Sequence, residues 1–284
     1  MLGSEVLKVF VESKKFHVSA TLRNMKDLKY FNSKENQKIK FIKFDVSKDN
    51  VNKLKNAVKK NTIILNCIGI IKPNINENNI KSILNAISVN SIFPNKLSET
   101  FSKKNMIYQI ATDCVYDGSS KLYSENFAHN PIDVYGKTKS LGEVNDKNFF
   151  NIRASIIGKE VKNHKSLYDW FLNQKKNSKL NGFTNHLWNG ITTRAFGHIL
   201  VSIIENKIDL PNKIHICPKN IVTKFQMLKL FKKNNDKNIL IKPVKAKVKI
   251  NRTLSTKYKK INDLIWKKSI YKKIPTIEQL IKEI

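Results

Sequence analysis

Tyr135 and Lys139 lie four residues apart near the middle of the chain and carry complementary acid–base chemistry. Residues 135–146 have a helical pattern, and on a helix two residues four apart share one face. A tyrosine with its ordinary pKa of about 10 exchanges protons poorly at neutral pH, and a neighbouring ammonium favours the phenolate and lowers that pKa. The hydroxyl of Thr112, at the end of a predicted strand, is placed to bind the same oxygen atom. Together the three residues predict proton transfer at a carbonyl oxygen.

The Tyr-x-x-x-Lys spacing alone is weak evidence, because the chain has 8 tyrosines and lysine is its commonest charged residue. Tyr30 and Lys34 repeat the spacing in a polar stretch that we interpret as solvated surface. The surroundings distinguish Tyr135, since Pro131 precedes it by four residues and Gly136 follows it directly. A Thr-Asp pair also stands upstream, at the end of a predicted strand. This context favours Tyr135 as the catalytic residue.

The elements that must position these residues follow an alternating pattern. Short apolar runs with strand character occur at 16–22, 39–44, 62–68, 106–111 and 149–154. Helical patterns lie between them at 51–60, 80–103 and 135–146. Strands that alternate with helices are typical of a parallel sheet covered on both faces. We therefore predict an α/β fold with a Rossmann-type, doubly wound parallel sheet.

The alternation weakens in the second half of the chain. Short strands are predicted at 214–217 and 239–242, and helices at 193–206, 224–233 and 276–284. This half is expected to form a smaller C-terminal lobe that binds substrate. The predicted division places a dinucleotide-binding domain in residues 1–150. Residues 151–284 are mainly the substrate-binding lobe, with some segments returning to the first domain.

The residues that follow the predicted strands are candidates for cofactor binding, because ligands lie beyond the carboxyl ends of such strands. Arg23 follows the first predicted strand, Asp45 and Val46 the second, and Cys67 and Gly69 the third. All are polar or small enough to lie against a dinucleotide. An arginine after the first of these strands suits the 2′-phosphate of NADP(H), where an acidic residue would bind the ribose of NAD(H). We expect NADP(H), with NAD(H) the less favoured cofactor.

Composition excludes several functions. The formal net charge is +31, yet only 4 of the 53 basic residues are arginine, and the lysines are spread along the whole chain. This spread argues against a specific nucleic-acid surface and still favours small anionic ligands. The 3 cysteines are few and far apart, and the 6 histidines show no metal-ligand spacing, so neither a disulfide framework nor a metal site is predicted. The longest apolar stretch is too short to span a bilayer. These features predict a cytoplasmic protein without a membrane segment.

Residues 110–144 resemble the active-site segment of the extended short-chain dehydrogenase/reductases, and most closely the dTDP-4-dehydrorhamnose reductase branch. That branch carries a Ser/Thr-Asp-x-Val-Phe/Tyr-x-Gly segment, which residues 112–118 match, and a Pro-x-x-x-Tyr-Gly-x-x-Lys segment, which residues 131–139 match. Further segments that look like the same group lie at 66–72, 90–94, 151–158, 188–193 and 251–255.

The resemblance implies NADPH-dependent reduction of a 4-keto deoxysugar that is linked to a nucleotide, as a step in making surface polysaccharide precursors. It implies that Thr112, Tyr135 and Lys139 are catalytic and that Tyr135 and Lys139 also contact the cofactor. Asp45 and Val46 resemble the pair that contacts adenine. A homodimer is also expected. The candidate substrate-binding residues are Asp113, Cys114, Arg153, Ser155, Trp188, Asn189, Thr193 and Arg252. Family members often carry tyrosine where Cys114 stands, so this chain lacks the side chain that usually contacts the sugar at that position.

The N-terminus matches only part of the family pattern. In that group a first strand leads into a Gly-x-x-Gly-x-x-Gly turn and a helix, and Gly3 matches the third glycine of the turn. A helix is predicted over residues 4–12, so we expect that about a dozen upstream residues, with a strand and two glycines, are missing. A misplaced start site and a genuine loss of cofactor binding are the two explanations.

Two other functions stay open from the sequence. An epimerase of the same superfamily would use the same residues, whereas a dehydratase would need a glutamate where Cys114 stands. A non-catalytic binding or regulatory subunit belongs to a different class. The incomplete glycine turn favours the subunit, and the intact Thr112, Tyr135 and Lys139 set favours an enzyme.

Overall fold

The structure, a computed structural model, describes residues 1–31, 39–120, 122–162 and 164–284. Among these residues the α-helices are α1 (Leu2–Ser13), α2 (Ile80–Ile87), α3 (Phe93–Phe101), α4 (Val134–Leu141), α5 (Leu167–Leu172), α6 (Thr193–Glu205), α7 (Lys224–Asn234), α8 (Lys259–Lys268) and α9 (Ile277–Ile281). The strands are β1 (Ser19–Leu22), β2 (Lys40–Lys43), β3 (Ile64–Asn66), β4 (Ile107–Ala111), β5 (Phe149–Arg153), β6 (Ile156–Ile157), β7 (Lys179–Phe183), β8 (His186–Trp188), β9 (Ile191–Thr192), β10 (Lys213–His215), β11 (Val222–Thr223), β12 (Leu240–Val244) and β13 (Ile250–Asn251). Lys34 of the second Tyr-x-x-x-Lys pair lies outside the described residues.

Parallel sheets form the centre of the molecule, and the predicted α/β class is confirmed. Four strands pair in the order β10-β5-β4-β3, all parallel. β1 and β2 form a separate parallel pair. The expectation of one continuous sheet is therefore met only in part, because the described strands include none that pairs with both β1 and β3.

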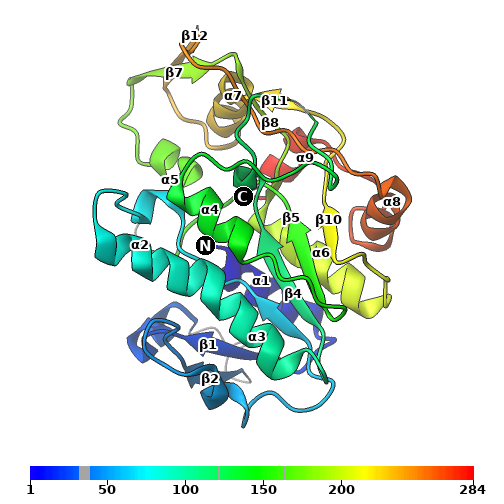
Figure 1. The fold of residues 1–284 in the computed structure, drawn as a ribbon. Helices are drawn as coiled ribbons and strands as arrows, with labels where there is room; N and C mark the ends of the chain where they lie inside the picture. Colours follow the sequence, from blue (N-terminus) through cyan, green and yellow to red (C-terminus); the bar gives the residue numbers. More distant parts are fainter. Residues whose placement is uncertain (32–38, 121, 163) are drawn as a thin grey trace.

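Helices cover both faces of the four-stranded sheet (Figure 1). Alternate side chains of a strand point to opposite faces. Tyr108 and Ile152 are buried in the cluster that contains α1 and α6. Ile107 precedes Tyr108 by one residue and Phe149 precedes Ile152 by three, so both point to the other face, where they are buried with Phe93 and other side chains of α3. The sheet is thus wrapped on both sides, as a doubly wound fold requires.

The predicted helix over residues 80–103 is present in three pieces. α2 leads through a π-helical turn at Ser88–Ile92 into α3 without leaving the helical path. The predicted helix over residues 51–60 is wrong, because only a 3₁₀ turn forms at Val51–Leu54. Of residues 51–60 only Val51 and Leu54 are buried, and so short a helix gains too little packing to form.

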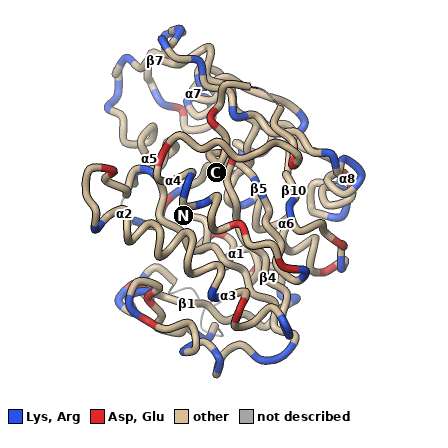
Figure 2. Tube along the Cα trace, viewed as in Figure 1, with Lys and Arg blue, Asp and Glu red and all other residues tan. Residues whose placement is uncertain are grey.

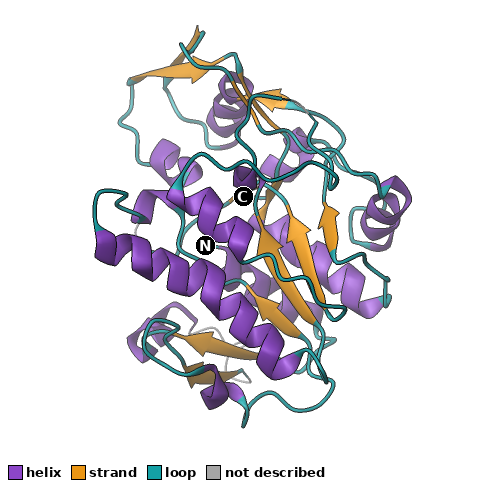
Figure 3. Ribbon diagram, viewed as in Figure 1, coloured by secondary structure: helices purple, strands orange, loops and turns teal. Residues whose placement is uncertain are grey.

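A second core lies in the C-terminal half of the chain, among helices and strands that lie together in the upper part of Figure 3. It contains buried side chains of α5, β7, β8, β11, α7 and α9. Other parts of this half return to the first core, since β10 pairs with β5 and α6 packs against α1. Lysine and arginine are spread over every part of the traced chain (Figure 2). Of the helices in the described part of the chain, none has the length and apolar character needed to cross a bilayer.

Candidate functional site

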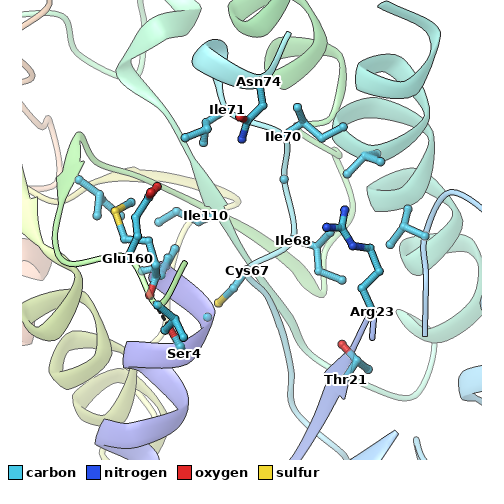
Figure 4. Close-up of a pocket in the computed structure, with 18 of the residues that line it drawn as sticks. Ser4, Thr21, Arg23, Cys67, Ile68, Ile70, Ile71, Asn74, Ile110 and Glu160 are labelled. Carbon is cyan, nitrogen blue, oxygen red and sulfur yellow. Dashed lines mark hydrogen bonds between the residues drawn. The ribbon is translucent and has the colours of Figure 1, made fainter. Parts of the chain in front are cut away.

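A cavity of about 630 Å³ opens where the carboxyl ends of β1, β3 and β4 meet the first turn of α1. Figure 4 shows Arg23 extending from the end of β1 alongside Ile68, with Cys67 lying toward Ser4 of α1. The cavity brings together twelve of the residues predicted from the sequence. They are Gly3, Arg23, Asp45, Val46, Cys67, Gly69, Thr112, Asp113, Cys114, Tyr135, Lys139 and Ser155.

Helix α4 positions the acid–base pair, Tyr135 and Lys139, at this cavity. Asp133 caps the helix, because its side chain accepts a hydrogen bond of 2.7 Å from the backbone N–H of Gly136. Gly136 lets the helix approach the segment after β4 closely: a Cβ there would lie 2.2 Å from the carbonyl oxygen of Cys114 and 2.8 Å from Cβ of Pro131. A glycine is needed at this contact, and the contact sets Tyr135 beside the end of β4.

Lys139 is buried, with 6% of its surface exposed, and its Nζ donates a hydrogen bond of 2.8 Å to the carbonyl oxygen of Ile110. Burial lowers the pKa of the Lys139 ammonium to about 8, while Glu143 and the Cys67 thiol act in the opposite direction. The ammonium therefore stays mainly protonated at neutral pH. It is fixed at the end of β4 by a backbone group and not by an ion pair.

The pKa of Tyr135 shifts upward, which is opposite to the direction that the sequence led us to expect. Burial is the largest cause, Cys114 adds to it, and the Thr112 side chain acts in the opposite direction. Lys139 is not among the groups that shift this pKa most, and the cost of ionising a partly buried hydroxyl dominates. Thr112 is buried and accepts a hydrogen bond of 3.2 Å from the Cys114 backbone N–H. At neutral pH Tyr135 is therefore a protonated hydroxyl, ready to act as a donor.

A second cavity, of about 480 Å³, adjoins the first and shares Arg23 and Asp45 with it. It is lined by Arg23, Asn24, Lys43, Asp45, Lys48, Asp49 and Lys53. Lys53 is paired with Asp49 at 3.1 Å, and Asp49 also accepts a hydrogen bond of 2.7 Å from the backbone N–H of Asp45. Four cations face two carboxylates here, so the cavity suits an anionic group.

Asp113, Cys114 and Arg252 form the other end of the site. The Arg252 side chain holds the loop after β4, donating from Nε to the carbonyl oxygen of Tyr116 at 2.8 Å and lying 3.9 Å from Sγ of Cys114. Burial raises the pKa of Asp113, and the charges of Arg252 and Lys224 act in the opposite direction. Arg252 does not line the main cavity itself, but it contacts Cys114, which does.

Arg153 does not reach the cavity, which corrects its predicted place in the sugar pocket. Only 1% of its surface is exposed, and its guanidinium donates to Glu143, Tyr116, His129 and His215. Arg153 ends β5, and its side chain points into a buried polar cluster formed by these four residues. No N–H group of this guanidinium is left for a substrate.

Three further substrate candidates also serve the protein interior. The indole N–H of Trp188 donates to Oγ of Ser155 at 2.8 Å, and its ring lies in the second core. The Asn189 side chain donates to, and accepts from, the backbone of Leu254. Thr193 is buried at the first turn of α6, against the segment that contains Gly158. None of the three lines the main cavity.

Sequence reasoning missed several cavity residues. Lys162 and Asp27 lie on the cavity wall and form an ion pair of 2.5 Å that joins the loop after β6 to the turn after β1. Asn74 and Glu160 line the same wall. No periodic signal marks these loops. Lys43 is the missed residue that the sequence could have identified. It ends the strand next to β1 and must therefore lie near Arg23.

The three cysteines are free thiols, and burial raises the pKa of each to about 12. Thiols with so high a pKa are poor nucleophiles. Across the described residues no group of three or more His, Cys, Asp or Glu side chains is arranged to hold a metal ion.

Comparison with known proteins identifies a matching family and solved structures of similar fold. The family described as the RmlD substrate binding domain matches residues 1–284. No curated protein sequence matches the chain. Among solved structures, a dTDP-4-dehydrorhamnose reductase from Clostridium acetobutylicum shares 20% identity, with a TM-score of 0.69 over 94% of this chain and 97% of that one.

Two more solved structures have the same fold. A dTDP-4-dehydrorhamnose reductase from Bacillus anthracis, in complex with NADP, shares 17% identity, with a TM-score of 0.71 over 94% of this chain and 97% of that one. A UDP-glucuronic acid 4-epimerase from Bacillus cereus, in complex with a fluorinated UDP-sugar and NAD, also shares 17% identity. Its TM-score is 0.76, over 99% of this chain and 94% of that one. At these identities the likeness establishes the Rossmann-type fold.

Proposed function

The chain belongs to the family of the RmlD substrate binding domain, and from this premise we propose that it is an NADPH-dependent reductase of nucleotide-linked 4-keto deoxysugars. The observation that carries the proposal is the shared cavity. Thr112, Tyr135 and Lys139 line one part of it, and Gly3, Arg23 and the other predicted cofactor residues line the rest. A carbonyl-reducing site next to a dinucleotide site is what such a reaction requires.

The cavity fits a dinucleotide phosphate. The first turn of α1 lines it, and the backbone N–H groups of a first turn lack partners within their own helix and favour anions. Arg23 lines both cavities, so a ligand that follows the ends of β1 and β2 meets its guanidinium together with Lys43 and Lys48. This cationic end suits the 2′-phosphate, which supports NADP(H) over NAD(H). The bound nicotinamide supplies the hydride.

The residues of the chain supply the proton and the orientation. As negative charge develops on the sugar oxygen, the protonated Tyr135 hydroxyl donates its proton to that oxygen. The Thr112 hydroxyl binds the same oxygen and holds the carbonyl in line. Lys139 stabilises the tyrosinate that remains, since its ammonium is charged at neutral pH. One of its three N–H donors is used by Ile110, and the others suit ribose hydroxyls.

The test is to incubate the purified protein with NADPH and a dTDP-linked 4-keto-6-deoxyhexose and to follow NADPH oxidation and the sugar product. A reductase consumes one NADPH for each 4-hydroxy sugar formed. Interconversion of two sugars without net NADPH consumption would instead identify an epimerase. Binding of NADPH without turnover, unaffected by Tyr135→Phe, would identify a non-catalytic subunit.

We also propose that the protein acts in the cytoplasm, in the synthesis of surface polysaccharide precursors, and as a homodimer. Its three free thiols suit a reducing compartment. Large apolar side chains are exposed on neighbouring helices: Ile80 and Leu84 one turn apart on α2, and Leu141 at the end of α4. Burial of these side chains between two copies would stabilise a dimer. Leu84→Glu should then shift the mass measured by light scattering to that of a monomer.

A further inference from the structure

Lys162 and Asp27 form an ion pair that joins two walls of the main cavity. Lys162 lies in the loop after β6, and Asp27 lies in the 3₁₀ turn Met25–Phe31 that follows β1. Nζ of Lys162 is 2.5 Å from Oδ2 of Asp27, and both residues line the cavity. Their side chains are 41% and 21% exposed, so the pair is placed where an entering ligand can contact it.

The loop that carries Lys162 is held by contacts of its own. The backbone N–H of Glu160 donates to Oδ2 of Asp169 on α5 at 2.7 Å. The backbone N–H of Lys165 donates to a carboxylate oxygen of Glu160 at 2.6 Å. These hydrogen bonds lie on both sides of Lys162 in the chain and do not involve its side chain. The ion pair with Asp27 is therefore not needed to shape the loop.

Both partners of the pair can separate at low cost. A partly exposed ion pair contributes little to stability. Asp27 lies in the first turn of its 3₁₀ segment, where backbone N–H groups without partners favour a carboxylate. Within the described part of the chain, Asp27 is the one side chain that Nζ of Lys162 binds. A stronger acceptor that enters the cavity can therefore take this ammonium from Asp27.

The position of Lys162 indicates what that acceptor is. Among the described residues, three cationic side chains line the cavity, and they are Arg23, Lys139 and Lys162. Lys139 is bound to a backbone carbonyl at the end of β4. Figure 4 shows Glu160, two residues before Lys162, on the side of Ser4 in α1, with Arg23 on the opposite side. The loop thus starts near the first turn of α1, and its ammonium reaches the turn after β1.

The proposed path of the dinucleotide runs between the same two walls, from the first turn of α1 to Arg23. Its phosphate oxygens accept hydrogen bonds from an ammonium as carboxylate oxygens do. We propose that Lys162 is a phosphate-binding residue of the dinucleotide site, and that Asp27 holds its ammonium until a phosphate displaces the carboxylate. The inference rests on the proposed function in taking the ligand to be a dinucleotide.

The two partners of the pair should change binding in opposite directions. The experiment is isothermal titration calorimetry of the full chain with NADPH and with NADH. Lys162→Met removes the phosphate contact and should weaken binding about tenfold, the value of a charge-assisted hydrogen bond. Asp27→Asn removes the competing carboxylate and should tighten binding about two- to fivefold, the value of a partly exposed ion pair. A pair that merely braces the cavity would weaken binding when either partner is lost, so weaker binding by Asp27→Asn would overturn the proposal.

A double-mutant cycle separates partner exchange from a simple effect of charge, because loss of a nearby carboxylate can by itself favour an anionic ligand. In the parent, Asp27→Asn removes the repulsion of the phosphate and also the cost of breaking the ion pair. In the Lys162→Met background only the repulsion remains to be removed. The tightening should therefore be smaller in that background. Equal tightening in both backgrounds would refute the exchange.

Lys165→Met is the matched control. Lys165 lies on the same loop, and its Nζ is 3.3 Å from Oδ1 of Asn74, but it does not line the main cavity. Its replacement should leave NADPH affinity nearly unchanged. A loss as large as that of Lys162→Met would assign the effect to the total charge of the loop and would contradict the proposal. Urea unfolding without ligand should give all single variants nearly the stability of the parent.

The choice of ligands identifies the phosphate group. An equal loss of NADPH and NADH binding in Lys162→Met would place the ammonium at the pyrophosphate, and a loss confined to NADPH would place it at the 2′-phosphate. Either result supports the proposal. The nucleoside diphosphate dTDP represents the other ligand of the proposed reaction, and its affinity should not change. A loss of dTDP binding alone would place Lys162 at the sugar nucleotide and overturn the proposal.

Inorganic pyrophosphate keeps the test independent of the proposed function. If the parent binds neither dinucleotide but binds pyrophosphate, and Lys162→Met weakens that binding, the proposed function fails and the phosphate-binding role of Lys162 stands. If NADPH binding and turnover are the same in the parent and in Lys162→Met, the proposed function stands and the role of Lys162 is wrong.

Discussion

Substitution of Gly136 by alanine tests whether the contact between α4 and the end of β4 sets the catalytic geometry. Two effects of opposite sign compete. Alanine favours a helix interior over glycine by about 1 kcal/mol. Against this, the added Cβ would stand 2.2 Å from the Cys114 carbonyl oxygen, where ordinary contact begins at 3.4 Å. Overpacking of this kind costs about 1–3 kcal/mol.

The clash should win, because its partner is backbone and cannot rotate away. Pro131 Cβ, at 2.8 Å, closes the other direction. We expect Gly136→Ala to lower the unfolding free energy by about 1–2 kcal/mol net, which is the upper half of the overpacking range less the gain in helix propensity. Relief of the clash requires α4 to move by about 1 Å relative to Thr112, and a displacement of that size costs about 10²-fold in kcat.

The assays are urea unfolding and steady-state turnover, with Lys137→Ala as the matched control. Lys137 is the next residue of the same helix and is exposed, so its replacement should change neither quantity measurably. A Gly136→Ala protein that is as stable as the parent, or more stable, with unchanged kcat would refute the reasoning. Helix propensity would then be the dominant effect, and the close approach would have no catalytic consequence.

Three other outcomes are expected. Tyr135→Phe should lower kcat by about 10²–10⁴-fold and leave the thermal shift caused by NADPH unchanged, because only the proton donor is lost; a loss of NADPH binding would contradict this. Arg23→Lys should weaken NADPH binding by about tenfold or more, the value of a charge-assisted hydrogen bond, and leave NADH binding unchanged; Lys53→Met, which removes a lysine already paired with Asp49, should affect NADPH less. The pKa of His215 is lowered by burial to about 4, so the folded state binds fewer protons than the unfolded state between about pH 6.5 and 4. The unfolding free energy should therefore fall across that window as the pH drops, and His215→Gln should flatten the fall; an equally steep fall in the variant would assign it to other groups, such as His198.

Most of the predicted cofactor and catalytic residues line the cavity, whereas several of the predicted substrate residues do not. Arg23, Asp45, Gly69 and Thr112 lie within three residues of a strand end, and topology alone brings the ends of neighbouring parallel strands together. The predicted strand positions agree with the observed ones to within a few residues, because short apolar runs bounded by polar residues mark buried strands. The order of the parallel strands is therefore enough to place the residues that follow them at the cavity.

The substrate candidates Arg153, Trp188, Asn189 and Thr193 do not line the main cavity, because burial depends on contacts between distant segments. Asn189 binds the backbone of Leu254, and Trp188 binds Ser155, and neither pairing is visible in local spacing. A polar residue that satisfies the protein interior has the same local pattern as one that binds a ligand. The predicted direction of the Tyr135 pKa shift was opposite to the one found for a related reason: the sequence pattern showed the neighbouring lysine but not the degree of burial.

Arginine is rare in this chain, and its few positions are informative. Only 4 of the 53 basic residues are arginine, although lysine supplies charge everywhere else. Arg153 donates to four side chains in the buried cluster. Arg194, on α6, joins Glu5 and Glu12 of α1. Arg252 binds two backbone carbonyl groups.

Each of these three sites needs donors that point in several fixed directions at once, which the planar guanidinium provides and a lysine ammonium does not. Arg23 is the fourth, and it stands where lysines already supply positive charge from Lys43, Lys48 and Lys53. Charge alone therefore gives no reason for an arginine there. A ligand that accepts several hydrogen bonds in a plane does, and a phosphate at the ends of β1 and β2 has that property. This is why replacement by lysine, which keeps the charge, is expected to weaken NADPH binding.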